Sequence, residues 1–260
     1  MLPPLNSLEA FINHSRDEGK RLILCNALDS LGLVALAHQF AMASAMLSDR
    51  ILFIDGEAMV IDKPAGLPVD RPRRGGDSLT DRLPDLRCGF RSSPVPLHRL
   101  DQDTSGCLLL ARNHSARKLL QRAFEERRVT KHYLAIVGGE ITEERGVIDV
   151  ALSKTSSAEA GWRMVGDPAG QEAVTNWRRV AVRDGFTLVE FQPVTGRTHQ
   201  IRVHAREAFG RGIVGDRVYG TPGGPMLLHA SRLTVPREGK ETIDVTAPLP
   251  QHFGEWRDVA

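Results

Sequence analysis

The sequence predicts an α+β domain built around a mixed sheet. The clearest support is a locally paired hairpin, residues 174–182 and 186–192, on either side of the turn Arg183-Asp184-Gly185. Helical patterns stand between only some of the β-like runs, whereas a doubly wound parallel sheet requires strands and helices to alternate regularly. Apolar residues make up 41% and charged residues 25% of the 260 residues, which excludes a mostly disordered or collagen-like chain.

Residues 1–48 differ in composition from the rest of the chain and predict an N-terminal helical extension, with a second domain over residues 49–260. The uncharged stretch between Asp29 and Asp49 approaches the length of a membrane span. His38 and Gln39 stand in its middle, and Ala, Ser and Gly outnumber Leu and Ile, which favours a helix packed on protein. The first residues also lack the basic start and apolar run of a secretory signal. We therefore expect no membrane association.

The second domain begins with strands and a loop. Residues 51–55 and 58–62 are short β-like runs joined by a turn at Gly56, and residues 63–78 are rich in Pro, Gly and Arg and predict a loop. The apolar run Cys107–Arg112 predicts a buried strand, and Asn113 or Ser115 can cap the next helix. One apolar face of this helix is expected to contain Ala116, Leu119, Leu120, Ala123 and Phe124.

The C-terminal half shows the same kinds of pattern. Tyr133–Val137 predicts a strand, and residues 153–170 predict a mobile loop or a hairpin. After the paired strands at 174–182 and 186–192, helical spacing begins near Thr198 and places Ile201, Ala205, Ala208 and Phe209 on one face.

Charge and cysteine content limit the class of protein. The formal net charge is only +2, but eleven Lys and Arg stand against five Asp and Glu between Arg82 and Tyr133. Such a segment suits a polyanion, although a basic run is also typical of an ordinary solvated helix face. The three cysteines, Cys25, Cys88 and Cys107, are far apart and outside any CxxC spacing, which argues against a disulfide framework or a structural zinc site. A reducing compartment, and hence the cytoplasm, is the expected location.

The run His98–Gly106 directly precedes the predicted buried strand and is the first candidate site. A rigid strand can hold such a loop in place, and a carboxylate from Asp101 or Asp103 can serve there as nucleophile, general base or metal ligand. The alternative is a turn in which either aspartate caps backbone amides. Nine consecutive residues dominated by polar and turn-forming types weaken that alternative.

Two further segments carry candidate residues. In Gly196–His204, the guanidiniums of Arg197 and Arg202 can hold a phosphate or pair with a buried carboxylate. His199 and His204 are five residues apart, which does not fit a metal-binding pair on one helix face. Tyr133 opens a strand, where a tyrosine can stack on a base or simply pack at the edge of the core.

These segments, HRLDQDTSG at 98–106, KHYLAIV at 131–137 and GRTHQIRVH at 196–204, together resemble the RluA-type pseudouridine synthases. ILFIDGEAMVIDKPAGLPV, GRGIVGDRVYG and LLHASRLTV are also similar, so the resemblance spans residues 51 to 250 approximately. It implies the pseudouridine synthase fold over residues 49–260: a mixed, largely antiparallel central sheet flanked by helices, with a basic catalytic cleft. It also implies conversion of uridine to pseudouridine in tRNA or rRNA, with no cofactor, no metal and no obligate protein partner.

The resemblance further implies roles for individual residues. Asp101 matches the essential aspartate, Tyr133 the tyrosine that stacks on the target base, and Arg202 the basic residue that pairs with the aspartate. Arg99 matches the arginine that fills the gap left by the flipped nucleotide. The same motifs supply the other predicted substrate contacts, which are Arg197, His98, Thr104 and Leu228.

Two other functions stay open at this point. A protein of the same fold can bind or chaperone RNA without catalysis, although all four positions that matter for catalysis are present here. A hydrolase with an aspartate nucleophile is the third possibility, and it would release free uracil from RNA.

Overall fold

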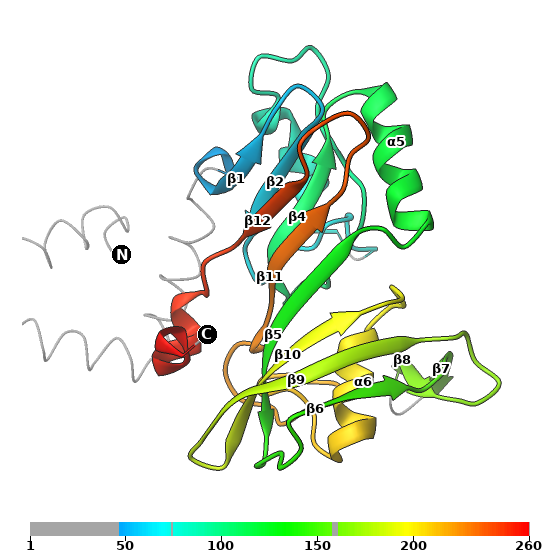
Figure 1. The fold of residues 1–260 in the computed structure, drawn as a ribbon, viewed down its shortest axis with the longest axis vertical. Helices are drawn as coiled ribbons and strands as arrows, with labels where there is room; N and C mark the ends of the chain where they lie inside the picture. Colours follow the sequence, from blue (N-terminus) through cyan, green and yellow to red (C-terminus); the bar gives the residue numbers. More distant parts are fainter. Residues whose placement is uncertain (1–46, 74, 158–160, 260) are drawn as a thin grey trace, which may run out of the picture. The chain divides into compact units, whose positions relative to one another are not determined.

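Figure 1 shows a computed structural model in which residues 47–73, 75–157 and 161–259 are described. The chain divides into two compact units, Met1–Asp49 and Arg50–Ala260, and the second contains every candidate site residue. The helical extension predicted for residues 1–48 lies outside the described residues except for its last two positions, which belong to the short 3-10 turn η1, Leu47–Arg50. Among the described helices, none is long and apolar enough to cross a membrane.

The second unit is built on one ten-stranded mixed sheet, which confirms the predicted α+β class. Its strands follow the order β1-β2-β4-β11-β5-β10-β9-β6, with β3 paired to β4 and β12 paired to β11. Within the described residues only β11 and β4 run parallel, so the sheet is largely antiparallel, as predicted. The strands are β1 (Ile51–Ile54), β2 (Ala58–Lys63), β3 (Val95–Pro96), β4 (Ser105–Ala111), β5 (Thr130–Gly138), β6 (Arg145–Asp149), β9 (Val174–Arg183), β10 (Phe186–Pro193), β11 (Leu228–Val235) and β12 (Ile243–Thr246).

Helices and a small hairpin complete the unit. The helix α5 (His114–Glu125) lies beside β4, and α6 (Gln200–Phe209) lies beside β10 in the other half of the sheet (Figure 1). Residues 153–170, predicted as a loop or hairpin, contain most of the two-stranded hairpin of β7 (Leu152–Ser157) and β8 (Gly161–Gly166). The short helices are α4 (Leu79–Arg82), η2 (Leu83–Leu86) and η3 (Gln251–Asp258).

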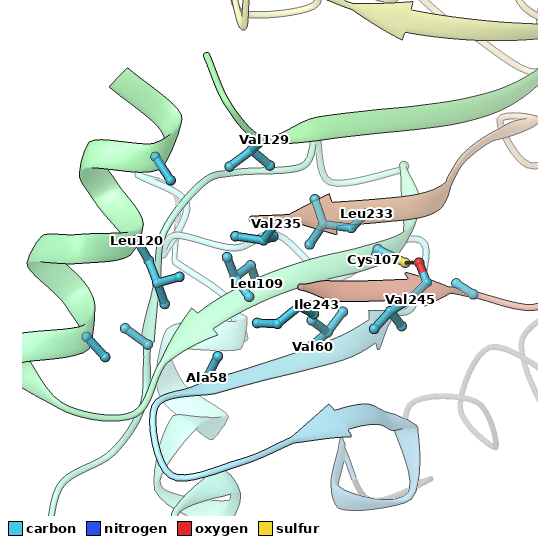
Figure 2. Packing of buried hydrophobic residues seen from close by; sticks show 14 residues of the cluster. Ala58, Val60, Cys107, Leu109, Leu120, Val129, Leu233, Val235, Ile243 and Val245 are labelled. Atoms are coloured by element: carbon cyan, nitrogen blue, oxygen red, sulfur yellow. Dashed lines mark hydrogen bonds between the residues drawn. The ribbon is translucent and has the colours of Figure 1, made fainter. Parts of the chain in front are cut away.

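The core lies where α5 packs against β4, β11 and β12 (Figure 2). All seven residues of β4 are buried, which is typical of a central strand covered on both faces. Leu109 points toward Leu120 of α5, and Leu233 and Val245 extend the same cluster across the neighbouring strands. Each fully buried aliphatic side chain of this kind contributes about 1.5–3 kcal/mol, so the core holds β4 and the loop before it in place.

Helix α5 begins at the cap that the sequence offers first. The side chain of Asn113 accepts a hydrogen bond of 2.8 Å from the Ala116 N–H, so Asn113 rather than Ser115 caps the helix. Ala116, Leu120 and Ala123 are buried as predicted, but Leu119 is 60% exposed, so its assignment to the apolar face was wrong. At 3.6 residues per turn Leu119 lies about 60° from Ala116, on the side away from Leu120.

The C-terminal half confirms the predicted hairpin and modifies the predicted helix. Asp184 and Gly185 form the two-residue turn between β9 and β10, and both have positive φ, as a type I′ turn requires. Gln200–Ala205 of α6 are all buried because this helix contacts both β8 and β10. Ala208 is exposed, whereas Phe209 packs against Trp177 with ring centroids 4.9 Å apart, so the predicted apolar face was wrong only at Ala208.

The buried His229 predicts that acid destabilises the fold. Its Nδ1 lies 2.8 Å from Ser105 Oγ in the interior, and burial lowers the pKa of His229 from 6.5 to about 4. Between these values the unfolded chain binds a proton that the folded chain does not, so the free energy of unfolding falls as the pH drops through that window.

Urea unfolding at pH 7 and pH 5 measures this effect. The His229 contribution lost by pH 5 is about 2 kcal/mol. The variant His229→Gln cannot titrate there, and its loss of stability between the two pH values should be smaller by that amount. Equal losses in the two proteins would contradict the assignment.

Candidate active site

The loop that carries Asp101 closes in a turn and enters β4 at a close approach of two backbones. It runs from β3 to β4, and the Thr104 N–H donates a hydrogen bond of 3.1 Å to the Asp101 carbonyl. At its end Gly106 has φ +107°, and a Cβ there would lie 2.2 Å from the carbonyl oxygen of Ala230 on β11. Only glycine fits this close approach of β4 and β11, so the loop meets the sheet at one fixed point.

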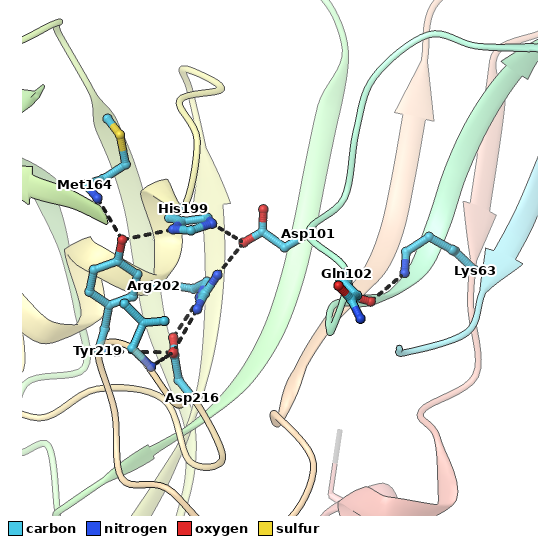
Figure 3. A network of polar contacts seen from close by, with 9 residues as sticks. Lys63, Asp101, Gln102, Met164, His199, Arg202, Asp216 and Tyr219 are labelled. Carbon is cyan, nitrogen blue, oxygen red and sulfur yellow. Dashed lines mark hydrogen bonds and ion pairs between the residues drawn. The ribbon is translucent and has the colours of Figure 1, made fainter. Parts of the chain in front are cut away.

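Lys63 anchors the same loop through a hydrogen bond to the carbonyl of Gln102. This lysine at the end of β2 is fully buried, and its ammonium donates to the carbonyl oxygens of Pro64, Leu67 and Gln102 at 2.8–3.1 Å. Burial lowers the pKa of Lys63 to about 7, while the charges of Asp103 and Asp101 oppose that shift. Three carbonyl acceptors match the three N–H bonds of the ammonium form. Lys63 therefore ties the residue next to Asp101 to the sheet (Figure 3).

A buried arginine links Asp101 to a second carboxylate (Figure 3). Arg202 of α6 donates from Nη1 to Asp101 Oδ2 at 3.0 Å. It also donates from Nε and Nη2 to the two oxygens of Asp216, at 2.7 and 2.8 Å. The Asp216 carboxylate is fully buried and accepts two further hydrogen bonds, from the backbone N–H groups of Val218 and Tyr219. The paired bonds fix the plane of the guanidinium, which in turn fixes Asp101 Oδ2.

The electrostatics of this network favour its charged form. Burial opposes ionisation of Arg202, but its hydrogen bonds to Asp216 and Asp101 raise its pKa above the ordinary arginine value. Burial likewise opposes ionisation of Asp216, while Arg202 and the two backbone N–H groups hold its pKa below the ordinary value. The pair is therefore ionised at neutral pH.

Tyr133 approaches the loop from the central strand β5. The side chain is buried, and burial together with the Asp101 charge raises the pKa of its hydroxyl well above 10. Tyr133 is therefore a neutral phenol at physiological pH. A neutral aromatic ring beside a carboxylate offers a flat apolar surface for a base.

The predicted substrate contacts lie around the same centre in different settings. Arg99 is 75% exposed, and among the described residues its one ion pair is with Asp70 at 3.3 Å. Arg197 donates from Nε to the Glu172 carbonyl at 2.9 Å. The Nε2 of His98 accepts from the Leu109 N–H at 3.0 Å, which gives that nitrogen a structural partner. Thr104 and Leu228 are buried at the base of the site.

All eight residues predicted from the sequence line one pocket of about 490 Å³. This volume lies in the range of ligand sites in proteins. The eight residues are His98, Arg99, Asp101, Thr104, Tyr133, Arg197, Arg202 and Leu228. The lining holds five Lys and Arg side chains against two Asp and Glu, so the pocket is basic, as expected for a site that meets a polyanion.

Sequence reasoning missed four residues of the network. Lys63, His199, Asp216 and Tyr219 all stand within quoted motifs, but none was assigned a role. Burial distinguishes two of them, Lys63 and Asp216, since a charged residue is rarely fully buried unless it is paired. No spacing rule in the sequence reveals that Arg202 pairs with a residue 14 positions further on, because the two belong to different elements.

Known proteins are similar to this chain in both sequence and fold. Residues 57–207 match the family model described as RNA pseudouridylate synthase. An uncharacterised RNA pseudouridine synthase of Zymomonas mobilis is 49% identical over 212 residues, covering 80% of this chain and 97% of that protein. The ribosomal large subunit pseudouridine synthase C of Rickettsia bellii is 31% identical over 229 residues, covering 85% and 75%. A solved structure, human RNA pseudouridylate synthase domain containing 4, is 28% identical with a TM-score of 0.69, covering 84% of this chain and 95% of that one.

Proposed function

Since the chain belongs to the RNA pseudouridylate synthase family and is an RNA pseudouridine synthase, we propose that Asp101 is the carboxylate that holds the uridine during isomerisation. One observation carries the proposal. Asp101 lies in the basic pocket with Oδ2 bound to Arg202 at 3.0 Å, whereas Oδ1 has no partner among the described residues. One oxygen is thus fixed by the protein and the other is left for the substrate.

The isomerisation of uridine requires a group that holds the sugar while the base turns, and a carboxylate can do so. The N1–C1′ bond breaks, the base turns, C5 joins C1′, and the hydrogen leaves C5 while N1 gains one. The product has the atoms of the substrate, so the reaction consumes no water, oxidant or reductant. A carboxylate can carry the sugar through this sequence as an ester or as an ion pair, as carboxylates do in glycoside hydrolysis.

Tyr133, Leu228 and Arg202 support the same step. The target uridine has to leave its stack, which costs a few kcal/mol. Stacking on Tyr133 offsets about 1–3 kcal/mol of that cost, and Leu228 forms an apolar wall of the same pocket. Arg202 holds Asp101 Oδ2 by a hydrogen bond, and its own guanidinium is oriented by the paired bonds to Asp216. The position of each side chain in the pocket supports the role proposed for it.

The remaining predicted contacts are proposed to bind RNA. Arg99 is exposed, and its long side chain is suited to enter the space that a flipped nucleotide leaves. Arg197, at the rim, is suited to a backbone phosphate, and Thr104 and the ring of His98 complete the wall. These contacts supply affinity without sequence specificity, so the choice of uridine rests on RNA shape and single-stranded bases.

The substrate is proposed to be rRNA or tRNA in the cytoplasm, acted on without an obligate protein partner. The Rickettsia relative is named for the large ribosomal subunit, which favours rRNA. A compact tRNA stem-loop is the second candidate.

Pseudouridine mapping of total RNA from cells with and without this protein tests the proposal. We expect loss of one or a few sites in rRNA, and their return when the wild-type chain is supplied but not when Asp101→Ala is supplied. Loss of a tRNA site would identify the second substrate. Identical maps would contradict the proposed activity in the cell, and recovery of growth by Asp101→Ala with unmodified RNA would favour an RNA chaperone.

A further inference from the structure

We propose that His199 is a positioning residue for Asp101, acting as a neutral imidazole whose Nε2–H faces the carboxylate. The inference deepens the proposed function and rests on it. His199 stands immediately before α6, and its Nε2 lies 3.9 Å from Asp101 Oδ2 (Figure 3). None of the roles proposed for the other pocket residues involves this ring.

A chain of hydrogen bonds determines where the imidazole proton sits. The backbone N–H of Met164 on β8 can only donate, and it does so to the Tyr219 hydroxyl oxygen at 2.9 Å. The Tyr219 hydroxyl proton then points to its other neighbour, His199 Nδ1, also at 2.9 Å. An imidazole that accepts at Nδ1 carries its proton on Nε2, the nitrogen that faces Asp101.

The two other protonation states fit the surroundings less well. With the proton on Nδ1, the Tyr219 hydroxyl would lose its only acceptor among the described residues. The unprotonated Nε2 would then face a carboxylate oxygen, and two lone pairs would oppose each other. A doubly protonated ring would also leave the hydroxyl proton without an acceptor, and it would stand near the Arg202 guanidinium. Burial and this neighbouring cation lower the pKa of His199, although Asp101 opposes them.

The backbone of His199 and the β7–β8 hairpin hold the imidazole ring in this orientation. His199 has φ +55° and ψ +16°, a left-handed conformation that a residue with a Cβ adopts at a cost, and its side chain makes no capping bond to α6. The ring is packed edge-on against Tyr219 and against Trp162 of β8, with centroids 5.6 and 5.1 Å apart. The β7–β8 hairpin therefore fixes the ring in two ways: Trp162 packs against it, and Met164 orients the Tyr219 hydroxyl that donates to it.

The expected effect is on the orientation of the reacting carboxylate. Arg202 already binds Oδ2, and a second N–H directed at the same oxygen turns Oδ1 toward the pocket. The present separation of 3.9 Å is longer than a hydrogen bond. Catalytic hydrogen bonds often tighten when substrate binds, so His199 is expected to approach Asp101 in the RNA complex.

Three variants of the full chain test the proposal in single-turnover reactions and RNA-binding assays. His199→Phe keeps a ring but has no N–H, and its rate should fall about ten- to hundredfold, as expected when a reacting group is misplaced. RNA affinity should change little. His199→Gln offers an amide N–H near the position of Nε2 and should recover a large part of the rate. Tyr219→Phe removes the donor to Nδ1 and should lower the rate as well.

Nitrogen NMR of the histidine rings reads the protonation state directly in the free protein. We expect the wild-type His199 to show a protonated Nε2 and an unprotonated Nδ1, and Tyr219→Phe to lose that preference. A protonated Nδ1 in the wild type would overturn the proposal even if a variant failed to fold. So would a His199→Phe protein with the wild-type rate. An inactive wild-type enzyme would instead contradict the proposed function, and the NMR result would stand apart from it.

Discussion

The variant Asp101→Ala is expected to lower the single-turnover rate of pseudouridine formation at least about a thousandfold, the scale of losing an essential catalytic group. The pocket offers no second carboxylate that is held by Arg202 and open to substrate on its other oxygen within the described residues. RNA affinity should stay within about threefold, because phosphate contacts dominate binding to RNA and Asp101 makes none.

Release of tritium from RNA labelled at uridine C5 measures this reaction, since that hydrogen leaves when C5 joins C1′. Asp103→Ala is the matched control, because Asp103 lies two residues away on the same loop and is exposed. The control should retain most of the wild-type rate. Substantial turnover by Asp101→Ala would show that the carboxylate is not required, and free uracil among wild-type products would indicate a hydrolase instead.

Much of the fold follows from local sequence. Asp184-Gly185 specifies a two-residue turn by its backbone preferences alone, and Asn113 caps α5 through a contact three residues away. The eight predicted site residues also reach one pocket, because their motifs stand at the ends of strands and helices that the core holds together. The turn and the cap were predictable because a short stretch of chain decides each of them, whereas the meeting of the eight residues in one pocket depends on the whole sheet.

The network around Asp101 could not be predicted in the same way. Its contacts join residues far apart. The bond from Arg202 to Asp101, 101 positions earlier, confirms a pairing that only the family resemblance implied, and the bond from Lys63 to a carbonyl 39 positions later was not predicted at all. Whether a lysine is solvated or buried under a loop depends on the packing of the whole sheet. The exposed Leu119 shows the reverse case, since its apolar type predicted a burial that the rotation of α5 does not provide.

Asp216→Ala is expected to lower the free energy of unfolding by about 3–5 kcal/mol, the usual cost of removing one partner of a buried ion pair. The Asp216 carboxylate is fully buried and accepts four hydrogen bonds, from Arg202 and from the backbone of Val218 and Tyr219. Its loss leaves a buried guanidinium with Asp101 as its remaining carboxylate partner.

Urea unfolding measures the loss, and Asp244→Ala provides the control. Asp244 also binds an arginine through two bonds, but both partners of that pair are largely exposed, so a much smaller effect is expected. Equal losses in the two variants would contradict the importance of burial.

The double variant Arg202→Met with Asp216→Leu separates stability from chemistry. Replacing both partners of a buried ion pair by apolar residues of similar volume is often neutral. The N–H groups of Val218 and Tyr219 lose their acceptor in this protein, so it should regain only part of the stability that Asp216→Ala loses. It should remain at least about a hundredfold slower than wild type, because Asp101 has lost the donor that fixes Oδ2. Recovery of both stability and rate would show that the ion pair serves folding alone. Recovery of stability without rate would show that the arginine is kept at a cost to orient the carboxylate.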